Sequence, residues 1–159
     1  MSFVIRVATE DDIPVILELI IELAVYENEP DAVSISVEDL KTYGFNNNPR
    51  FHCFVGEVNG VVQGMALTYE RFSTWKGPVL HLEDLIVSQK MRGSGLGTAL
   101  LDEVVAYGNQ LGVKRITWVV LNWNTSAIEF YKKKGAKIDS EWDSVNLDEV
   151  GIKNYLSKI

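Results

Sequence analysis

The stretch LHLEDLIVSQKMRGSGLGTALLDEVV, residues 80–105, joins three elements that together decide the fold. Its nearly continuous apolar start predicts a strand over Val79–Val87, buried on both faces in the middle of a sheet. From Leu96, apolar residues recur at helical spacing until Gly112, which predicts a helix. A strand, a glycine turn and a helix bring backbone N–H groups together at a helix N-terminus, where they can bind an anion. The glycines of this turn are Gly93, Gly95 and Gly97.

Strands and helices also alternate on both sides of this stretch. The Asn59-Gly60 dipeptide between FHCFVGEV and VVQGMALTY predicts a hairpin with a type I′ turn. Asp11 or Asp12 can cap a helix that has Pro14 in its first turn and ends near Tyr26. The other expected elements are a strand over 4–7, a short helix over 37–43, a strand over 115–121, a helix with capping-box spacing at Ser126 and Glu129 that ends at Gly135, and a tail of one or two short strands before a terminal helix.

Composition limits the class of protein. A chain of 159 residues with 47% apolar residues fits one domain over 1–159. No apolar stretch approaches the ~20 residues of a membrane span, and the N-terminus lacks the layout of a signal peptide, so a cytoplasmic protein with no membrane partner is expected. A net charge of −7 disfavours nucleic acid as a partner and is compatible with a small cationic substrate. Cys53 is the only cysteine, which excludes an internal disulfide, and its apolar neighbours predict a buried thiol.

Three phosphate-binding patterns can be tested on the glycine turn. A Walker loop needs Gly-Lys-Ser/Thr at its end, but Thr98 and Ala99 follow Gly97. The dinucleotide fingerprint G-x-G-x-x-G also fails, because the glycines alternate with single residues. Arg92-x-x-Gly95-x-Gly97 fits R/Q-x-x-G-x-G/A, in which amides bind the pyrophosphate of coenzyme A. On this motif alone, an ordinary glycine-rich turn remains an equal alternative.

Several further motifs in the same order resemble the GNAT superfamily of acetyl-CoA-dependent N-acetyltransferases, and its diamine acetyltransferase branch in particular. They are FVIRVAT, ELAVYE, FHCFVGEV, LEDLIV, RGSGLG and WNTSAIEFYKKKGA, and they cover nearly the whole chain up to about residue 140. The resemblance implies an α/β (α+β) fold with a mixed, mostly antiparallel sheet, splayed between its fourth and fifth strands and with helices on both faces. Coenzyme A would lie in the splay.

The resemblance also implies which residues bind the cofactor, acetyl-CoA, without a metal. The fourth strand would pair with the pantetheine amides, the glycine turn would hold the pyrophosphate, and the start of the helix after residue 123 would contact coenzyme A again. Helix capping is a sufficient structural reason for Asn124 and Ser126. The expected cofactor-binding residues are Leu85, Ile86, Val87, Arg92, Gly93, Ser94, Gly95, Leu96, Gly97, Thr98, Asn124, Thr125, Ser126 and Ala127.

Two catalytic residues follow from the same resemblance. Tyr131 matches the family's acid in the context F-Y-x-x-x-G-A, and a phenol with a reference pKa near 10 can protonate or hydrogen-bond a leaving thiolate. Glu83 matches the position that removes the proton of the acceptor ammonium through water. Successive side chains of a strand point to opposite faces, so Glu83 and Asp84 cannot both be buried without partners or a cleft. The alternatives are a core role for Tyr131 and ion pairs for the two carboxylates.

The acceptor is expected to be a small amine. Tyr26, Glu27, Trp75, Glu83 and Asp84 match substrate-side positions of the branch. The stretch FSTWKG at 72–77 lacks the acidic residue and proline of polyamine-specific members and resembles the thialysine N-epsilon-acetyltransferase sub-branch. A thialysine-like or lysine-like amine therefore ranks slightly above spermidine. His52 and His81 lie inside predicted strands without metal-ligand spacing, which favours structural roles.

Three expectations remain open at this point. The resemblance implies a homodimer whose second subunit completes the acceptor site. A protein lysine or N-terminal acetyltransferase is one alternative function, and a coenzyme A-binding sensor without turnover is another.

Overall fold

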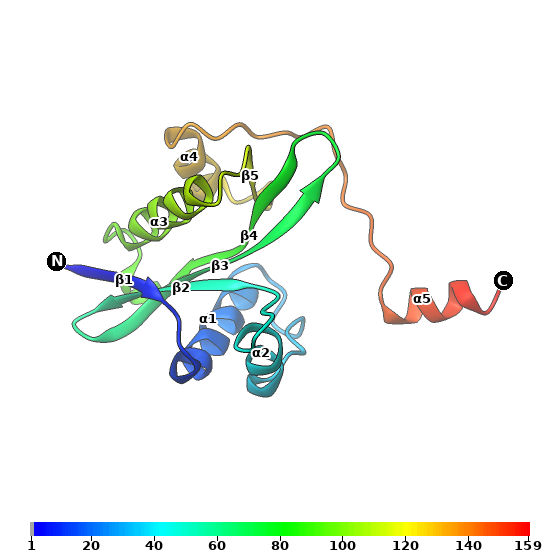
Figure 1. The fold of residues 1–159 in the computed structure, drawn as a ribbon, viewed down its shortest axis with the longest axis horizontal. Coiled ribbons are helices and arrows are strands. Elements are labelled where there is room, and N and C mark those ends of the chain that lie inside the picture. Colours follow the sequence, from blue (N-terminus) through cyan, green and yellow to red (C-terminus); the bar gives the residue numbers. More distant parts are fainter. Residues whose placement is uncertain (1) are drawn as a thin grey trace. The chain divides into compact units, whose positions relative to one another are not determined.

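The computed structural model describes residues 2–159, and the chain divides into two units, Met1–Val119 and Val120–Ile159. The first unit contains a five-stranded sheet in which the strands lie side by side in chain order (Figure 1). The first four strands are antiparallel, and the fifth is parallel to the fourth, as the expected mixed sheet requires. The strands are β1 (Phe3–Val7), β2 (His52–Val58), β3 (Val61–Ser73), β4 (Gly77–Val87) and β5 (Ile116–Thr117). The expectation of one domain over 1–159 stays a prediction.

The hairpin predicted at Asn59-Gly60 is present. Both residues have positive φ angles, 54° and 76°, which a type I′ turn requires. The next hairpin is longer than the sequence indicated, because β3 continues to Ser73 and β4 begins at Gly77. The Ser73 hydroxyl accepts hydrogen bonds from the N–H groups of Trp75 and Lys76, and this closes the turn.

The sheet separates between β4 and β5. Only two residue pairs join these strands, Leu80 with Ile116 and His81 with Thr117, so the fifth strand is much shorter than the predicted 115–121. Beyond His81, the stretch from Leu82 to Val87 continues along β3 but is not paired with β5. The splay expected between the fourth and fifth strands is therefore confirmed.

A β-bulge interrupts β4 at Glu83. Leu82 lies opposite Thr68 and Asp84 lies opposite Leu67, so Glu83 is an extra residue between two consecutive pairs. Paired residues of an antiparallel ladder point to the same face of the sheet. His81 pairs with Tyr69, and Asp84 pairs with Leu67. Tyr69 and Leu67 are two positions apart on β3 and point to the same face, so His81 and Asp84 share that face.

Glu83 contacts His81 and therefore points to this face as well. Strict alternation had placed Glu83 and Asp84 on opposite faces. That interpretation is wrong, because the bulge changes the alternation at this point.

Helices cover both faces of the sheet in the first unit (Figure 1). On one face lie α1 (Ile13–Tyr26) and α2 (Val37–Gly44), whose bounds agree with the sequence within a residue. A short 3₁₀ turn, η1 (Glu10–Asp12), precedes α1. The core on this side includes Ile16, Leu19, Met65, Leu67 and the expected buried thiol of Cys53. On the other face, α3 (Leu96–Gln110) buries Leu96, Leu100 and Val104.

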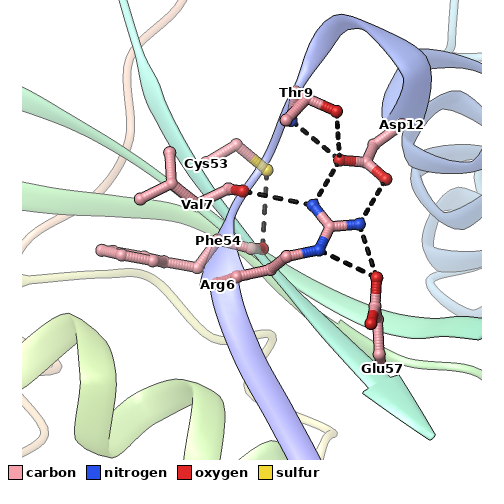
Figure 2. A network of polar contacts seen from close by, with 7 residues as sticks. All are labelled: Arg6, Val7, Thr9, Asp12, Cys53, Phe54 and Glu57. Carbon is pink, nitrogen blue, oxygen red and sulfur yellow. Dashed lines mark hydrogen bonds and ion pairs between the residues drawn. The ribbon is translucent and has the colours of Figure 1, made fainter. Parts of the chain in front are cut away.

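An ion-pair network fixes the start of α1 to the sheet, as Figure 2 shows. The guanidinium of Arg6 donates to both carboxylate oxygens of Asp12, at 2.7 and 2.8 Å, and to Oε1 of Glu57, at 2.6 and 2.8 Å. Asp12 also accepts the N–H of Thr9 at 2.8 Å. These hydrogen bonds, led by that of Arg6, lower the pKa of Asp12 to about 2, and Asp12 and Glu57 raise the pKa of Arg6.

Replacing Asp12 with Asn is expected to lower the free energy of unfolding at pH 7 by about 2 kcal/mol. A carboxylate whose pKa is lowered on folding stabilises above its unfolded pKa, and this contribution is lost as the pH falls towards 2. Urea unfolding of both proteins from pH 7 to pH 2 measures the difference, which should shrink below pH 4. A constant difference over that range would contradict the ion-pair interpretation.

The second unit contains α4 (Thr125–Lys133) and α5 (Glu149–Leu156). The cap of α4 is Asn124, whose Oδ1 accepts the N–H of Ala127 at 3.2 Å, and not Ser126 as the capping-box spacing suggested. The terminal helix is present, but Val120–Ile159 contains none of the short strands expected in the tail. Among residues 2–159, every helix is too short or too polar to cross a lipid bilayer.

Candidate functional site

Three acidic residues gather where the end of α1 meets β4. Asp84 is largely buried, and burial is the main cause that raises its pKa to about 6; the charges of Glu83 and Glu27 add to the effect. Burial also raises the pKa of Glu27, which directly follows α1. The structure therefore brings together three of the substrate-side residues expected from the sequence. Such a negatively charged cluster attracts a cation and costs the chain stability when all three groups are ionised.

The side chain of Glu83 is about half exposed, at 51%. Its Oε2 lies 3.5 Å from Nε2 of His81, and its carboxylate contributes, after burial, to the raised pKa of Tyr69. On the other side of the His81 ring, Nδ1 lies 3.0 Å from Oγ1 of Thr117. Glu83 therefore lies in a polar region of this face that includes groups of β3, β4 and β5.

His52 has the structural role expected for it. Its ring stacks on Tyr107 of α3, with ring centroids 4.5 Å apart and an angle of 20° between the planes. Burial lowers the pKa of His52, so the imidazole is neutral at pH 7.

The glycine turn lies between β4 and the start of α3, after a short 3₁₀ turn, η2 (Gln89–Met91). Gly93 and Gly95 have φ angles of 76° and 95°, in the left-handed region that favours glycine. The Ser94 hydroxyl accepts the N–H of Leu96 at 3.4 Å. Among residues 2–159, the N–H groups of Gly97 and Thr98 donate to no acceptor. A turn with unpaired N–H groups at a helix N-terminus fits the pyrophosphate of coenzyme A.

Arg92 links the glycine turn to α1. Its guanidinium carbon lies 4.5 Å from the centre of the Tyr26 ring, and Nη2 lies 3.8 Å from Oε1 of Glu22. The same Glu22 oxygen accepts the N–H of Gln89 at 2.8 Å. The structure therefore places Tyr26, expected on the substrate side, against Arg92, expected on the cofactor side.

At the end of β4, the backbone edge of Leu85, Ile86 and Val87 faces the splay. Leu85 and Val87 pair with Ala66 and Gly64 and point to the face covered by α3, while Ile86 is buried on the opposite face. Because β5 ends at Thr117, the backbone edge of these residues is not paired with β5. An extended molecule with amide groups can pair with such an edge.

Trp75 does not lie near the acidic cluster within one chain. It is 80% exposed in the turn between β3 and β4, before Gly77. Glu83 lies six positions beyond Gly77 along β4, which corresponds to roughly 20 Å of extended strand. The substrate role of Trp75 stays a prediction.

The remaining expected residues belong to the second unit. Tyr131 lies on α4 and is 9% exposed, and its ring centroid is 5.3 Å from that of Phe130. Asn124 caps this helix, so its cap role is established and its cofactor role stays a prediction. Of the other three N-terminal residues, Thr125 and Ser126 are exposed and Ala127 is partly buried.

Comparison with known proteins identifies the family. A model of the acetyltransferase (GNAT) family matches residues 17–136. The chain belongs to the GNAT family. It is an acetyl-CoA-dependent N-acetyltransferase.

Three named relatives match most of this GNAT chain. A thialysine N-epsilon-acetyltransferase of Sus scrofa is 35% identical over 99% of both chains. One of Bos taurus is 40% identical over 86% of both. A human spermidine/spermine N(1)-acetyltransferase-like protein is 36% identical over 84% of this chain, which corresponds to 20% of that protein.

Solved structures share the GNAT fold. An integron cassette protein from Vibrio cholerae superposes with a TM-score of 0.80 and 25% identity, and covers 100% of this chain and 99% of its own. An aminoglycoside acetyltransferase from a soil metagenome has a TM-score of 0.76 at 18% identity, over 92% of this chain and 97% of its own. The second likeness concerns the fold alone.

Replacing Asp84 with Asn is expected to stabilise this GNAT protein by about 1–3 kcal/mol at pH 7. The folded pKa is raised to about 6, so ionised Asp84 opposes folding above that pH, and the cost disappears below the unfolded pKa near 4. Urea unfolding at pH 7.5 and pH 4 measures the effect. Glu18→Gln is the control, because it neutralises an exposed carboxylate of α1 that does not contribute to the raised pKa of Asp84. Equal stability of wild type and Asp84→Asn at pH 7.5 would show that ionised Asp84 does not destabilise the folded protein.

Two polar contacts of the GNAT site were missed from the sequence. The pairing of His81 with Thr117 depends on the register of β4 and β5, and the bond of Glu22 to Gln89 joins distant segments. No local sequence signal identifies either contact. In the described part of the chain, no three His, Cys, Asp or Glu side chains are grouped to hold a metal ion. The expected absence of a metal stays a prediction.

Proposed function

We propose that the protein transfers an acetyl group directly from acetyl-CoA to the primary amine of a small cationic acceptor. The observation that carries this proposal is the cluster of Glu83 and Asp84 on β4 with Glu27 at the end of α1, at the point where the sheet opens. A buried carboxylate with a raised pKa beside two more acids is costly for stability and suits a cationic ligand.

The acceptor must lose a proton before it can attack. An ammonium with a pKa near 10.4 is neutral in roughly one molecule in 10³ at pH 7. Glu83 is the half-exposed acid of the cluster and can take this proton, directly or through water, while Asp84 and Glu27 hold the cation. This division of roles assigns proton transfer to the most accessible carboxylate and attraction of the cation to the two less exposed ones.

The residues that would hold acetyl-CoA supply backbone groups. The N–H groups of Gly97 and Thr98 would bind the pyrophosphate, with Arg92 to Thr98 around it, and the edge of Leu85, Ile86 and Val87 would pair with the pantetheine arm. Acetyl-CoA supplies the activated acetyl group as a thioester. Holding both substrates side by side provides proximity without a covalent enzyme intermediate.

Tyr131 is proposed as the acid. Its Oη would donate a proton or a hydrogen bond to the departing sulfur. The Tyr131 residue as a whole is only 9% exposed, so its ring is held by packing.

A thialysine-like or lysine-like acceptor is favoured over a long polyamine. The turn FSTWKG has Lys76 and no acidic residue, so it repels a second distant ammonium and tolerates an α-carboxylate. The relatives of Sus scrofa and Bos taurus are thialysine N-epsilon-acetyltransferases, which supports the same choice.

A homodimer is proposed as well, with the exposed Trp75 turn of one chain contributing to the acceptor site of the other. Sedimentation of the free protein tests this assembly.

A panel of amines tests the proposal directly. Release of coenzyme A thiol is measured with thialysine, lysine, ornithine, spermidine and an N-terminal peptide as acceptors. The proposal expects turnover with the amino-acid amines and higher kcat/KM for them than for spermidine. Turnover with the peptide alone, or binding of acetyl-CoA without turnover of any amine, would contradict it.

Glu83→Gln separates proton transfer from binding. If Glu83 takes the proton, kcat should fall roughly 10²-fold at pH 7 and recover as the pH approaches the pKa of the amine, since solution then supplies the neutral nucleophile. A role in binding alone would raise the acceptor KM without recovery at high pH. We expect the first result in kcat and KM profiles from pH 6.5 to 9.5. A profile of unchanged shape with unchanged KM would exclude both roles.

A further inference from the structure

His81 occupies the last position of β4 that is paired with β5, directly before the splay. It is only 8% exposed, and its parallel pairing with Thr117 places the threonine hydroxyl beside the ring, at 3.0 Å from Nδ1. Tyr69 of β3 lies on its other side, with ring centroids 5.1 Å apart. The imidazole is therefore held in place by contacts with both neighbouring strands, β3 and β5.

The partners of the ring decide which nitrogen carries the proton. Burial lowers the pKa of His81 more than Glu83 raises it, and Arg71 of β3 lowers it further, so the ring is neutral at pH 7 and has one N–H. A threonine hydroxyl can donate or accept, but the Glu83 carboxylate can only accept. The two contacts are both favourable when Thr117 donates to Nδ1 and Nε2–H points to Glu83. This tautomer is assigned from the partners of the ring.

Glu83 is half exposed at its bulge position, and both His81 and the Tyr69 hydroxyl interact with its carboxylate. The charged and titratable groups facing this region are Tyr69 and Arg71 of β3, Asp84 of β4 and Glu27 after α1. The two acids repel the Glu83 carboxylate, whereas Nε2 of His81 lies 3.5 Å from Oε2 and attracts it. This distance is longer than a direct hydrogen bond, so the contact guides the carboxylate without neutralising it.

We propose that His81 is a positioning residue for the Glu83 carboxylate, with the Thr117 hydroxyl holding its ring in the required orientation. The inference rests on the proposed role of Glu83 in removing the proton of the acceptor. Since misplacement of a reacting group reduces the rate, losing His81 should slow turnover while leaving acetyl-CoA binding unchanged.

A double-mutant cycle tests this role, with kcat, acceptor KM and acetyl-CoA Kd measured at pH 7. His81→Phe keeps a ring of similar shape and removes both nitrogens, and we expect kcat to fall about tenfold. His81→Gln keeps an N–H donor near the position of Nε2 and should recover part of that loss. Thr117→Val, which removes only the hydroxyl, should lower kcat about threefold, and Thr117→Ser should not. In the Glu83→Gln background, His81→Phe should have less than a twofold further effect.

The outcomes separate this inference from the proposed function. An equal loss of kcat by His81→Phe in both backgrounds, or no loss in the wild-type background, would overturn the positioning role although Glu83→Gln still impairs turnover. A Glu83→Gln protein with wild-type kcat and KM would overturn the proposed role of Glu83 and this inference together. If His81→Phe does not fold, the comparison of Thr117→Val with Thr117→Ser tests the same role, and equal kcat in these two proteins would overturn the role assigned to Thr117 and His81.

Discussion

Tyr131→Phe is expected to lower kcat roughly 10²–10⁴-fold while the acetyl-CoA Kd stays within a few fold. The substitution removes one hydroxyl from a buried ring on α4 and changes little of its shape. An acid that acts as the sulfur departs contributes to the rate and not to the binding of substrates. Stopped-flow measurement of thiol release, with acetyl-CoA affinity measured by calorimetry, gives both quantities.

Phe130 supplies the matched control for this prediction, because it is the neighbouring aromatic residue of α4 and has no hydroxyl. Phe130→Leu should change thermal stability more than turnover per folded molecule. Near-normal kcat of Tyr131→Phe at several pH values would return Tyr131 to a purely structural role.

Gly97→Val is expected to weaken acetyl-CoA binding roughly 100-fold or more, about 3 kcal/mol. A Cβ at this position would lie 3.5 Å from Cγ2 of Val87, an ordinary contact, so the chain itself can accommodate a side chain. The added bulk would instead occupy the space in front of the Gly97 and Thr98 N–H groups, which the pyrophosphate must approach closely. Isothermal titration with acetyl-CoA measures the change.

Gly97 is a better test than Gly95, because Gly95 has a φ of 95° and any side chain there is strained. Ala106→Val is the control: it introduces the same β-branched side chain at an exposed position of α3, away from the glycine turn. Its acetyl-CoA Kd should equal that of the wild type. An unchanged Kd in Gly97→Val would show that the glycine turn is only a connection between β4 and α3.

Local signals predicted most of the first unit. Asn59-Gly60 fixes a turn by its own backbone preferences, and Pro14 with the apolar spacing after it fixes the start and face of α1. The glycine pattern made this turn an anion-site candidate, and Gly93 and Gly95 have the positive φ angles that glycine favours. These features are determined by residues adjacent in the sequence, so they can be predicted from the sequence alone.

The features that were wrong or missed depend on distant partners. The run ITWVVL indicates a long strand, but only Ile116 and Thr117 find partners on β4, because the sheet opens beyond them. No feature of the sequence LEDL predicts that Glu83 is left unpaired in the ladder between β3 and β4. Ser126 and Asn124 both have a side chain suited to a helix cap, and Asn124 is the one whose oxygen reaches an N–H of the first turn. The stacking of Arg92 on Tyr26 likewise joins segments far apart in the chain.

Because of the bulge in β4, the proposed base can be lost without disturbing the pairing of the sheet. Glu83 is the one residue of Gly77–Val87 without a partner on β3, so an in-frame loss of its codon would leave Leu82 opposite Thr68 and Asp84 opposite Leu67. The sheet would then become regular, with each remaining side chain on its present face. A gene that lost this single codon would still encode the sheet and the glycine turn, but the product would lack the proposed base. A loss of three nucleotides would therefore be expected to reduce turnover at pH 7 about as much as Glu83→Gln does, while the residues proposed to bind acetyl-CoA stay in place.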